Sequence, residues 1–194
     1  MSAKRLVIAG VGAIGSHAAW LCRNLGARLA LIDFDRVESK NLLSQLYVKP
    51  SIGKNKADAL KLQLLNFCGV QADAYGVRLG EDNVATLLAG ADLVVDAFDN
   101  AKSRGVLSAH ARKTGLPLLH AGLSGDGTFG LVRWDERFTA DAEDVAGQAT
   151  CEGGDHLPLI ALLGATVARI VQEHFTSGAR HDAMVTLRGV TWME

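Results

Sequence analysis

The sequence predicts a doubly wound α/β fold with a mostly parallel sheet. Short apolar runs alternate along the chain with longer segments in which apolar residues recur at three and four positions. A glycine-rich turn joins the first apolar run to the first helical segment, as such folds require. Of the 194 residues, 48% are hydrophobic and 21% are charged, which is ordinary for a globular α/β protein. We therefore expect one domain over residues 1–194.

Each apolar run rich in Val, Leu or Ile is expected to form a strand, and each segment of helical period to cover one face of the sheet. The parallel strands are expected at 5–9, 28–32, 70–75, 92–97 and 117–121. The helices are expected at 14–25, 54–67, 81–89, 101–115 and 157–175.

Two additional strands are expected on the C-terminal side, at 127–134 and 184–192, and we expect them to run antiparallel to the others. Between them, the polar stretch 135–156 has no clear period. It is expected to form a long, mobile crossover loop, and loops of this length are usually functional or disordered.

Charge and hydropathy argue against nucleic acid and membranes as partners. The formal net charge is -1, and no apolar run approaches the roughly 20 residues that a membrane span requires. The N-terminus leads directly into a strand without the pattern of a signal peptide. The three cysteines, Cys22, Cys68 and Cys151, include no Cys-x-x-Cys pair, which indicates a reducing compartment. A cytoplasmic location is expected.

The glycine-rich turn has the context of a dinucleotide-binding fingerprint. The residues Gly10-Val11-Gly12-Ala13-Ile14-Gly15 follow an apolar strand and open a helix. Gly10 permits a sharp turn, Gly12 lets the backbone approach a phosphate, and Gly15 lets the helix pack closely on the strand. The N-terminus of the helix offers free N–H groups to an anion.

Asp33 ends the second strand, eighteen residues after Gly15. A carboxylate at this position can accept hydrogen bonds from ribose hydroxyls. The glycines and Asp33 alone are adequate for an NAD-dependent oxidoreductase. Such an enzyme also needs a substrate domain with a catalytic His, Lys or Tyr, for which 194 residues leave little space.

The residues after Asp33 resemble the ThiF/MoeB and ubiquitin-activating-enzyme superfamily. In that family a strand ends in Asp-x-Asp-x-Val, Asn-Leu-x-Arg-Gln follows, and Gly-x-x-Lys opens the next helix. The corresponding segments here are Asp33-Phe34-Asp35-Arg36-Val37, Asn41-Leu42-Leu43-Ser44-Gln45 and Gly53-Lys54-Asn55-Lys56. Two further segments match in the same order, a strand ending in Asp99-Asn100 with Arg104 beyond it, and Thr150-Cys151-Glu152-Gly153-Gly154 before an apolar helix.

The resemblance implies a Rossmann-like fold and ATP-dependent adenylation of the C-terminal glycine of a ubiquitin-like or sulfur-carrier protein. The implied cofactors are ATP and Mg²⁺, and the implied partner is a small carrier ending in Gly-Gly. A homodimer or heterodimer is also implied. Many relatives hold a structural zinc with two Cys-x-x-Cys pairs, which this chain lacks, so no structural zinc is expected.

Adenylation needs cations, because charge develops on the phosphates as pyrophosphate leaves. By resemblance, Lys56 reaches the phosphates; the alternative is a solvated lysine, as expected for Lys54. Asp99 ends a parallel strand, where a carboxylate can hold Mg²⁺. Its alternative role is the N-cap of the following helix, and both roles are compatible.

Five other positions are assigned to the nucleotide pocket through the same resemblance. Asp33 and Asp35 can equally be solvated turn residues that shape their loop. Asn41 and Gln45 would otherwise be ordinary polar loop positions. Arg104 either approaches the edge of the pocket or pairs with Glu81 or Asp82. The five positions are Asp33, Asp35, Asn41, Gln45 and Asn100.

Cys151 carries a second chemical hypothesis. In relatives a cysteine in this segment takes the acyl group as a thioester, or a sulfur as part of an acyl persulfide. His156 is nearby and a helix begins near Leu157, and a helix N-terminus lowers a thiol pKa. The alternative is a bystander in the loop. Cys22 and Cys68 are expected to be small apolar fillers.

Two departures from the family pattern favour a partner-dependent protein as the alternative. Ser44 stands where the family has an arginine, and the first strand begins by about Arg5, leaving no room for an extension that donates an arginine to a partner subunit. Each missing cation costs a few kcal/mol of transition-state stabilisation unless it is replaced. Lys49, Lys54 or a partner protein can compensate. Otherwise the chain is a nucleotide-binding subunit with little activity alone.

Nucleotide binding separates adenylation from oxidoreduction. We expect the purified protein to bind ATP with magnesium, measured by titration calorimetry, and to leave the fluorescence of NADH unchanged. Uptake of NADH without affinity for ATP would contradict the adenylation hypothesis.

Overall fold

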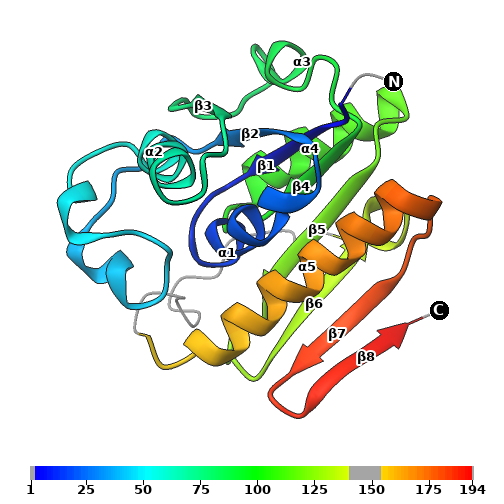
Figure 1. Ribbon diagram of the computed structural model, residues 1–194. Helices are drawn as coiled ribbons and strands as arrows, with labels where there is room; N and C mark the ends of the chain where they lie inside the picture. The colour runs from blue at the N-terminus through cyan, green and yellow to red at the C-terminus, as the bar shows by residue number, and fades with distance from the viewer. Residues whose placement is uncertain (1–2, 140–153, 194) are drawn as a thin grey trace.

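A computed structural model describes residues 3–139 and 154–193, which form one mixed sheet with helices on both faces (Figure 1). The strands pair in the order β3-β2-β1-β4-β5-β6-β7-β8. Their bounds are β1 Arg5–Ala9, β2 Arg28–Ile32, β3 Ala72–Tyr75, β4 Leu93–Asp96, β5 Leu118–Leu123, β6 Phe129–Trp134, β7 Asp182–Thr186 and β8 Gly189–Met193.

The helices divide between the two faces as a doubly wound fold requires. Alternate side chains of β1 point to opposite faces, so Leu6 and Ile8 pack with α1, α2 and α5, whereas Val7 and Ala9 pack with α3 and α4. The helices are α1 Ala13–Leu21, α2 Lys56–Cys68, α3 Val84–Leu87, α4 Ala101–Thr114 and α5 Leu157–Ser177. Short 3-10 helices cover Cys22–Asn24, Ser39–Leu43, Lys49–Ser51 and Asp135–Arg137. No helix in the described part of the chain could span a membrane.

The parallel half of the sheet confirms the sequence-based prediction. β1 pairs in parallel with both β2 and β4, while β3 and β5 extend the sheet on either side. The chain order therefore reverses between β1 and β4. Ligands of such sheets bind at the carboxyl ends of the strands that flank this reversal.

The C-terminal strands are antiparallel, as expected, but their number differs. β6, β7 and β8 pair successively in antiparallel register. The prediction of a single strand over 184–192 is wrong, because the chain turns back at Leu187 and Arg188 and forms the β7–β8 hairpin. Gly189 leaves the turn with φ of +142°, a conformation that favours glycine.

Helix boundaries also differ from the prediction where capping residues decide them. α2 begins at Lys56 rather than at residue 54, because the Asn55 side chain accepts a hydrogen bond from Asp58 N and caps the helix. The helix predicted at 81–89 is reduced to Val84–Leu87. In the predicted loop 135–156, residues 140–153 lie outside the described part of the chain.

The packing of α1 against the sheet predicts a contrast between two glycine substitutions. A Cβ on Gly15 would lie 1.8 Å from the Gly10 carbonyl oxygen, whereas a Cβ on Gly12 would have no neighbour within 4 Å in the described part of the chain. Gly15→Ala should lower the free energy of unfolding by about 1–3 kcal/mol. Gly12→Ala should change it by less than about 0.5 kcal/mol. Urea unfolding measures both, and equal stabilities would contradict this packing.

Cys22 is expected to be unreactive in the folded protein. Its side chain is in the core, as predicted, and burial raises the pKa of its thiol to about 12. The thiol therefore stays neutral at about pH 8, and only a thiolate reacts readily. Iodoacetamide should modify half-buried Cys68 in the native protein and Cys22 only in urea, as measured by peptide mass. Equal modification of Cys22 in both conditions would contradict its burial.

Candidate functional site

The glycine-rich turn lies at the reversal of strand order, in contact with the end of β4. Gly10 has φ of +84°, and its N–H donates to the Ile32 carbonyl at 2.8 Å. A Cβ on Gly10 would lie 2.8 Å from the Ala97 carbonyl carbon, so only glycine permits this contact. A Cβ on Gly12 would meet no atom of the described residues within 4 Å, so space remains beyond the backbone there. The turn thus leaves room for a ligand at Gly12, whereas Gly10 and Gly15 lie in close contact with neighbouring backbone.

Asp33 holds the glycine-rich turn and the next loop together. Its carboxylate accepts hydrogen bonds from Val11 N and from Asp35 N, each at 2.9 Å. The side chain is buried, which raises the pKa of its carboxyl. Hydrogen bonds from Asp35 and Val11 and the charge of Lys56 act in the opposite direction. Asp33 therefore fixes the backbone of both loops, and its expected hydrogen bond to a ribose stays a prediction.

Lys56 is a buried cation at the first residue of α2. Its side chain is 10% exposed, and its Nζ lies 3.2 Å from Asp35 Oδ2. Its backbone N–H donates to the Asp35 carbonyl at 2.8 Å. The alternative of a solvated lysine is therefore wrong for Lys56, whereas Lys54 is exposed as expected. Asp35 is half-exposed, so its carboxylate can exchange Lys56 for water when a ligand takes the ammonium.

Asn55 supports this pair and was not among the predicted site residues. Its Nδ2 donates to the carbonyl oxygens of Asp33 and Asp35, at 2.9 and 3.1 Å. Its Oδ1 caps α2. The N-cap preference of asparagine directly before the helical period was the available signal. The two carbonyl bonds join segments that are about twenty residues apart and could not be read from local pattern.

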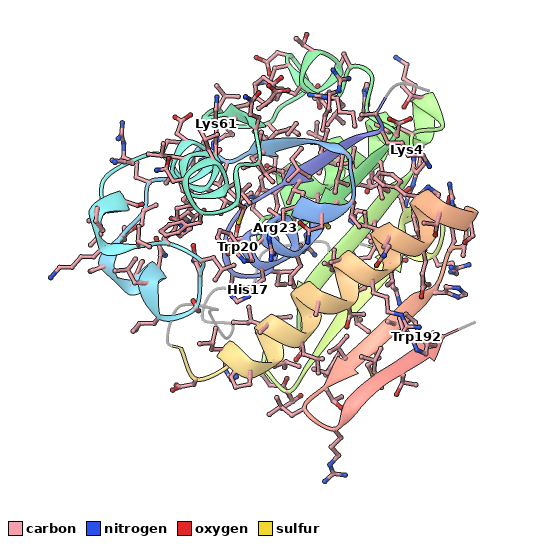
Figure 2. The ribbon with its side chains drawn as sticks, viewed as in Figure 1. Lys4, His17, Trp20, Arg23, Lys61 and Trp192 are labelled. Atoms are coloured by element: carbon pink, nitrogen blue, oxygen red, sulfur yellow. The ribbon has the colours of Figure 1, made fainter. Side chains whose placement is uncertain are left out.

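Asn41 and Gln45 are buried. The structure records no hydrogen bond from either side chain to Lys56 or Asp33. The Asn41 Oδ1 accepts from Glu38 N at 2.8 Å in a capping box. Gln45 lines an apolar cavity of about 520 Å³ between α1 and α2. Figure 2 shows His17 and Trp20 on α1 in this region. Gln45 Oε1 has no hydrogen-bond partner among the described residues.

Asn100 caps α4, and Asp99 is left as an exposed carboxylate beside it. The Asn100 side chain accepts from Ser103 N at 2.9 Å and caps α4. The alternative in which Asp99 caps this helix is therefore wrong. Asp99 lies three residues beyond Asp96, where β4 ends, so it does not end the strand as expected; its side chain is exposed beside the chain segment that contacts the glycine-rich turn. An exposed carboxylate at this edge has free lone pairs for a cation.

Arg104 does not pair with Glu81 or Asp82, so that prediction is wrong. Its Nε donates to the Phe98 carbonyl at 2.8 Å and lies 3.5 Å from Asp96 Oδ2. Its Nη2 donates to the Ala121 carbonyl at 3.1 Å. The guanidinium thus holds the segment between β4 and α4, which includes Asp99, against β5.

At the position of the missing arginine, Ser44 is buried, with its carbonyl oxygen 3.2 Å from His17 Nε2. Burial lowers the pKa of His17 against the opposing effect of this hydrogen bond, so His17 does not serve as a replacement cation at neutral pH. Lys49 and Lys54 are exposed.

Cys151 lies outside the described residues. Over residues 3–139 and 154–193, no group of three or more His, Cys, Asp or Glu is placed to hold a metal ion.

The chain resembles several adenylyltransferases in sequence. The sulfur carrier protein adenylyltransferase of Thermus thermophilus is 36% identical over 118 residues, which are 59% of this chain and 43% of that protein. The SAMP-activating enzyme E1 of Haloferax volcanii is 33% identical over 123 residues, 61% of this chain and 45% of that protein. The molybdopterin-synthase adenylyltransferase of Salmonella typhimurium is 28% identical over 173 residues, 84% and 70% of the two chains. The matched segment thus spans less than half of the first two relatives.

The fold is also that of a solved structure, E. coli MccB with ATP. The TM-score is 0.80 at 17% identity, over 98% of this chain and 64% of the MccB chain. At this identity the likeness concerns the fold alone. The ThiF family pattern matches residues 1–167, which include the glycine-rich turn, Asp33, Lys56 and Asp99. The chain belongs to the ThiF family.

Proposed function

We propose that this protein uses ATP and magnesium to adenylate the C-terminal glycine of a small ubiquitin-like or sulfur-carrier protein. The observation that carries the proposal is the buried Lys56 ammonium, held 3.2 Å from Asp35 Oδ2 beside Asp33 and next to the reversal of strand order. A buried, positioned cation near an open glycine turn suits the phosphates of a nucleotide. The names of the relatives agree with this chemistry.

The residues present suit a nucleoside triphosphate. The open space at Gly12 lies at the N-terminus of α1, where free N–H groups favour an anion. Each Asp33 oxygen accepts one backbone N–H and retains a second lone pair for a ribose hydroxyl. Lys56 then exchanges Asp35 for a phosphate oxygen. In this assignment Asn41, Gln45 and Asn100 contribute by shaping the surrounding loops.

The reaction forms one bond and breaks another at the α-phosphorus. The carboxylate of the carrier's terminal glycine attacks, an acyl phosphate bond forms, and the bond to the leaving pyrophosphate breaks. Lys56 stabilises the charge that develops on the phosphate oxygens. Asp99 is the residue that would hold magnesium, which supplies further charge neutralisation when bound. The Cys151 thiolate would then attack the acyl adenylate, forming a thioester as the acyl–phosphate bond breaks and AMP leaves.

A second candidate is a subunit that depends on a partner chain for its activity. The observation that favours it is Ser44, which is neutral and buried where relatives have an arginine. The exposed lysines Lys49 and Lys54 are the replacements within the chain, and otherwise a partner must supply the cation. The homodimer or heterodimer and the cytoplasmic location expected from the sequence belong to this proposal as well.

ATP–pyrophosphate exchange with a Gly-Gly carrier tests the proposed function. Lys56→Ala removes the phosphate cation and Asp99→Ala the magnesium ligand, and each should lower the exchange rate by about 10²–10³-fold. Lys61→Ala is the matched control, because Lys61 is an exposed lysine on the same helix (Figure 2) and should leave the rate within about twofold. Chelation of magnesium should stop exchange in all forms.

Two results would distinguish or overturn these candidates. Exchange that appears only when a second ThiF-family chain is added supports the partner-dependent form. Equal rates for Lys56→Ala and Lys61→Ala contradict the proposed role of the buried ammonium in either form.

A further inference from the structure

A buried histidine with a carboxylate at each ring nitrogen lies behind the β4–α4 loop. His120 is in β5 and is 1% exposed. Its Nδ1 lies 2.8 Å from Asp96 Oδ2, and its Nε2 lies 3.0 Å from Asp135 Oδ1. The Phe138 ring stacks on the imidazole with 3.9 Å between centroids. Neither His120 nor Asp135 has a part in the adenylation chemistry described above.

The proposal needs an N–H group on each ring nitrogen, and the Ser108 hydroxyl oxygen lies 3.5 Å from Nε2 as a further neighbour. A carboxylate is only an acceptor, and a neutral imidazole has a single N–H, so His120 can donate to both neighbours only with hydrogen on each nitrogen. Although burial raises the pKa of Asp135, hydrogen bonds from Arg112, His120 and Ser108 bring it below its ordinary value. Asp135 is therefore an ionised acceptor.

Two arginines complete a row of five side chains with His120 at its centre. Arg112 Nε lies 2.6 Å from Asp135 Oδ2, and Arg104 Nε lies 3.5 Å from Asp96 Oδ2. Each carboxylate thus lies between the His120 ring and an arginine. Such charge-assisted hydrogen bonds are short and directional, so the row fixes the orientation of the Asp96 carboxylate.

Asp96 transmits this orientation to the loop that bears Asp99. Its Oδ1 accepts from Phe98 N at 3.0 Å. Arg104 Nε donates to the Phe98 carbonyl at 2.8 Å. Both polar groups of Phe98 are therefore held by Asp96 and its neighbour Arg104, and Asp99 is the next residue in the chain.

We propose that His120 is a positioning residue for adenylation, which sets the β4–α4 loop through Asp96 and thereby aims the Asp99 carboxylate. The inference rests on the proposed function, in which Asp99 binds magnesium. Groups that orient a metal ligand through a hydrogen bond influence activity without touching the metal or substrate. The row of side chains keeps the β4–α4 loop in one conformation, so the loop does not have to be ordered in each catalytic cycle.

His120→Gln is the informative substitution. A glutamine amide can donate from its nitrogen to one carboxylate, but its oxygen then faces the other carboxylate without a hydrogen. His174→Gln is the matched control, because His174 is a partly buried histidine on α5 that packs on Trp134. The structure records no hydrogen bond between His174 and the β4–α4 loop.

The first experiment uses the free protein and nuclear magnetic resonance. In the wild type, both ring nitrogens of His120 should carry hydrogen, with the assignment made from the signal missing in His120→Gln. Exchange of the Phe98 amide with solvent should become at least about tenfold faster in His120→Gln, while the amides of Val94 and Val95 in β4 stay slow. His174→Gln should leave the Phe98 amide unchanged.

The second experiment measures ATP–pyrophosphate exchange with the same variants. His120→Gln should lower kcat by about 10- to 100-fold and raise the magnesium concentration for half-maximal rate. The KM for ATP should stay within about twofold, because the glycine turn and Lys56 are unchanged. A loss of fold in His120→Gln would be visible in thermal unfolding. In that case the ring nitrogens of the wild type are assigned through bonds from the His120 side chain, and their hydrogens then decide the question alone.

The outcomes separate this inference from the proposed function. A single N–H on the wild-type ring, or an unchanged Phe98 amide in folded His120→Gln, overturns the positioning role and leaves adenylation standing. A faster Phe98 amide with unchanged kcat also overturns it. A wild type that exchanges no pyrophosphate under any condition overturns the proposed function, while the Phe98 amide still reports whether His120 holds the loop.

Discussion

The close contact between the glycine-rich turn and the end of β4 is the constraint on which the candidate site depends. Gly10 and Gly15 bring the backbone of α1 against the Gly10 carbonyl and Ala97 so closely that a single methyl group would not fit. Three ends of strands are tied at this point, since Gly10 N donates to Ile32 and Ala97 N donates to Ala9. The first turn of α1, the loop after β2 and the loop after β4 therefore face a common space.

Around this contact, side chains from distant segments are ordered mainly by bonds to backbone groups. Asp33 accepts two N–H groups, and Asn55 donates to two carbonyls, so the loop that carries Asp35 is held from both sides. The Lys56–Asp35 pair differs, because one partner is buried and the other is half-exposed. A pair of this kind contributes little to stability and can be rearranged by a ligand, which suits a site better than a fully buried ion pair.

The parallel strands, the antiparallel C-terminal extension and the glycine turn could be predicted from the sequence, because apolar runs and glycine spacing act locally. The choice between Asp99 and Asn100 as a cap could not, since both residue types cap helices and only the start of α4 decides. The partners of Arg104 and His120 depend on strands β4 and β5 being neighbours, a fact of tertiary structure. The β7–β8 hairpin was missed because its two-residue turn, Leu187 and Arg188, contains neither the glycine nor the asparagine that usually marks such a turn.

Asn100, and not Asp99, provides the side-chain cap that the structure records at the start of α4. Under the proposed function, replacing Asp99 by its isosteric amide should therefore yield an intact molecule that still binds a carrier yet stalls before bond formation. Such a stalled form offers a practical bait, in which the natural carrier accumulates on the protein and can be recovered from cell extract and sequenced.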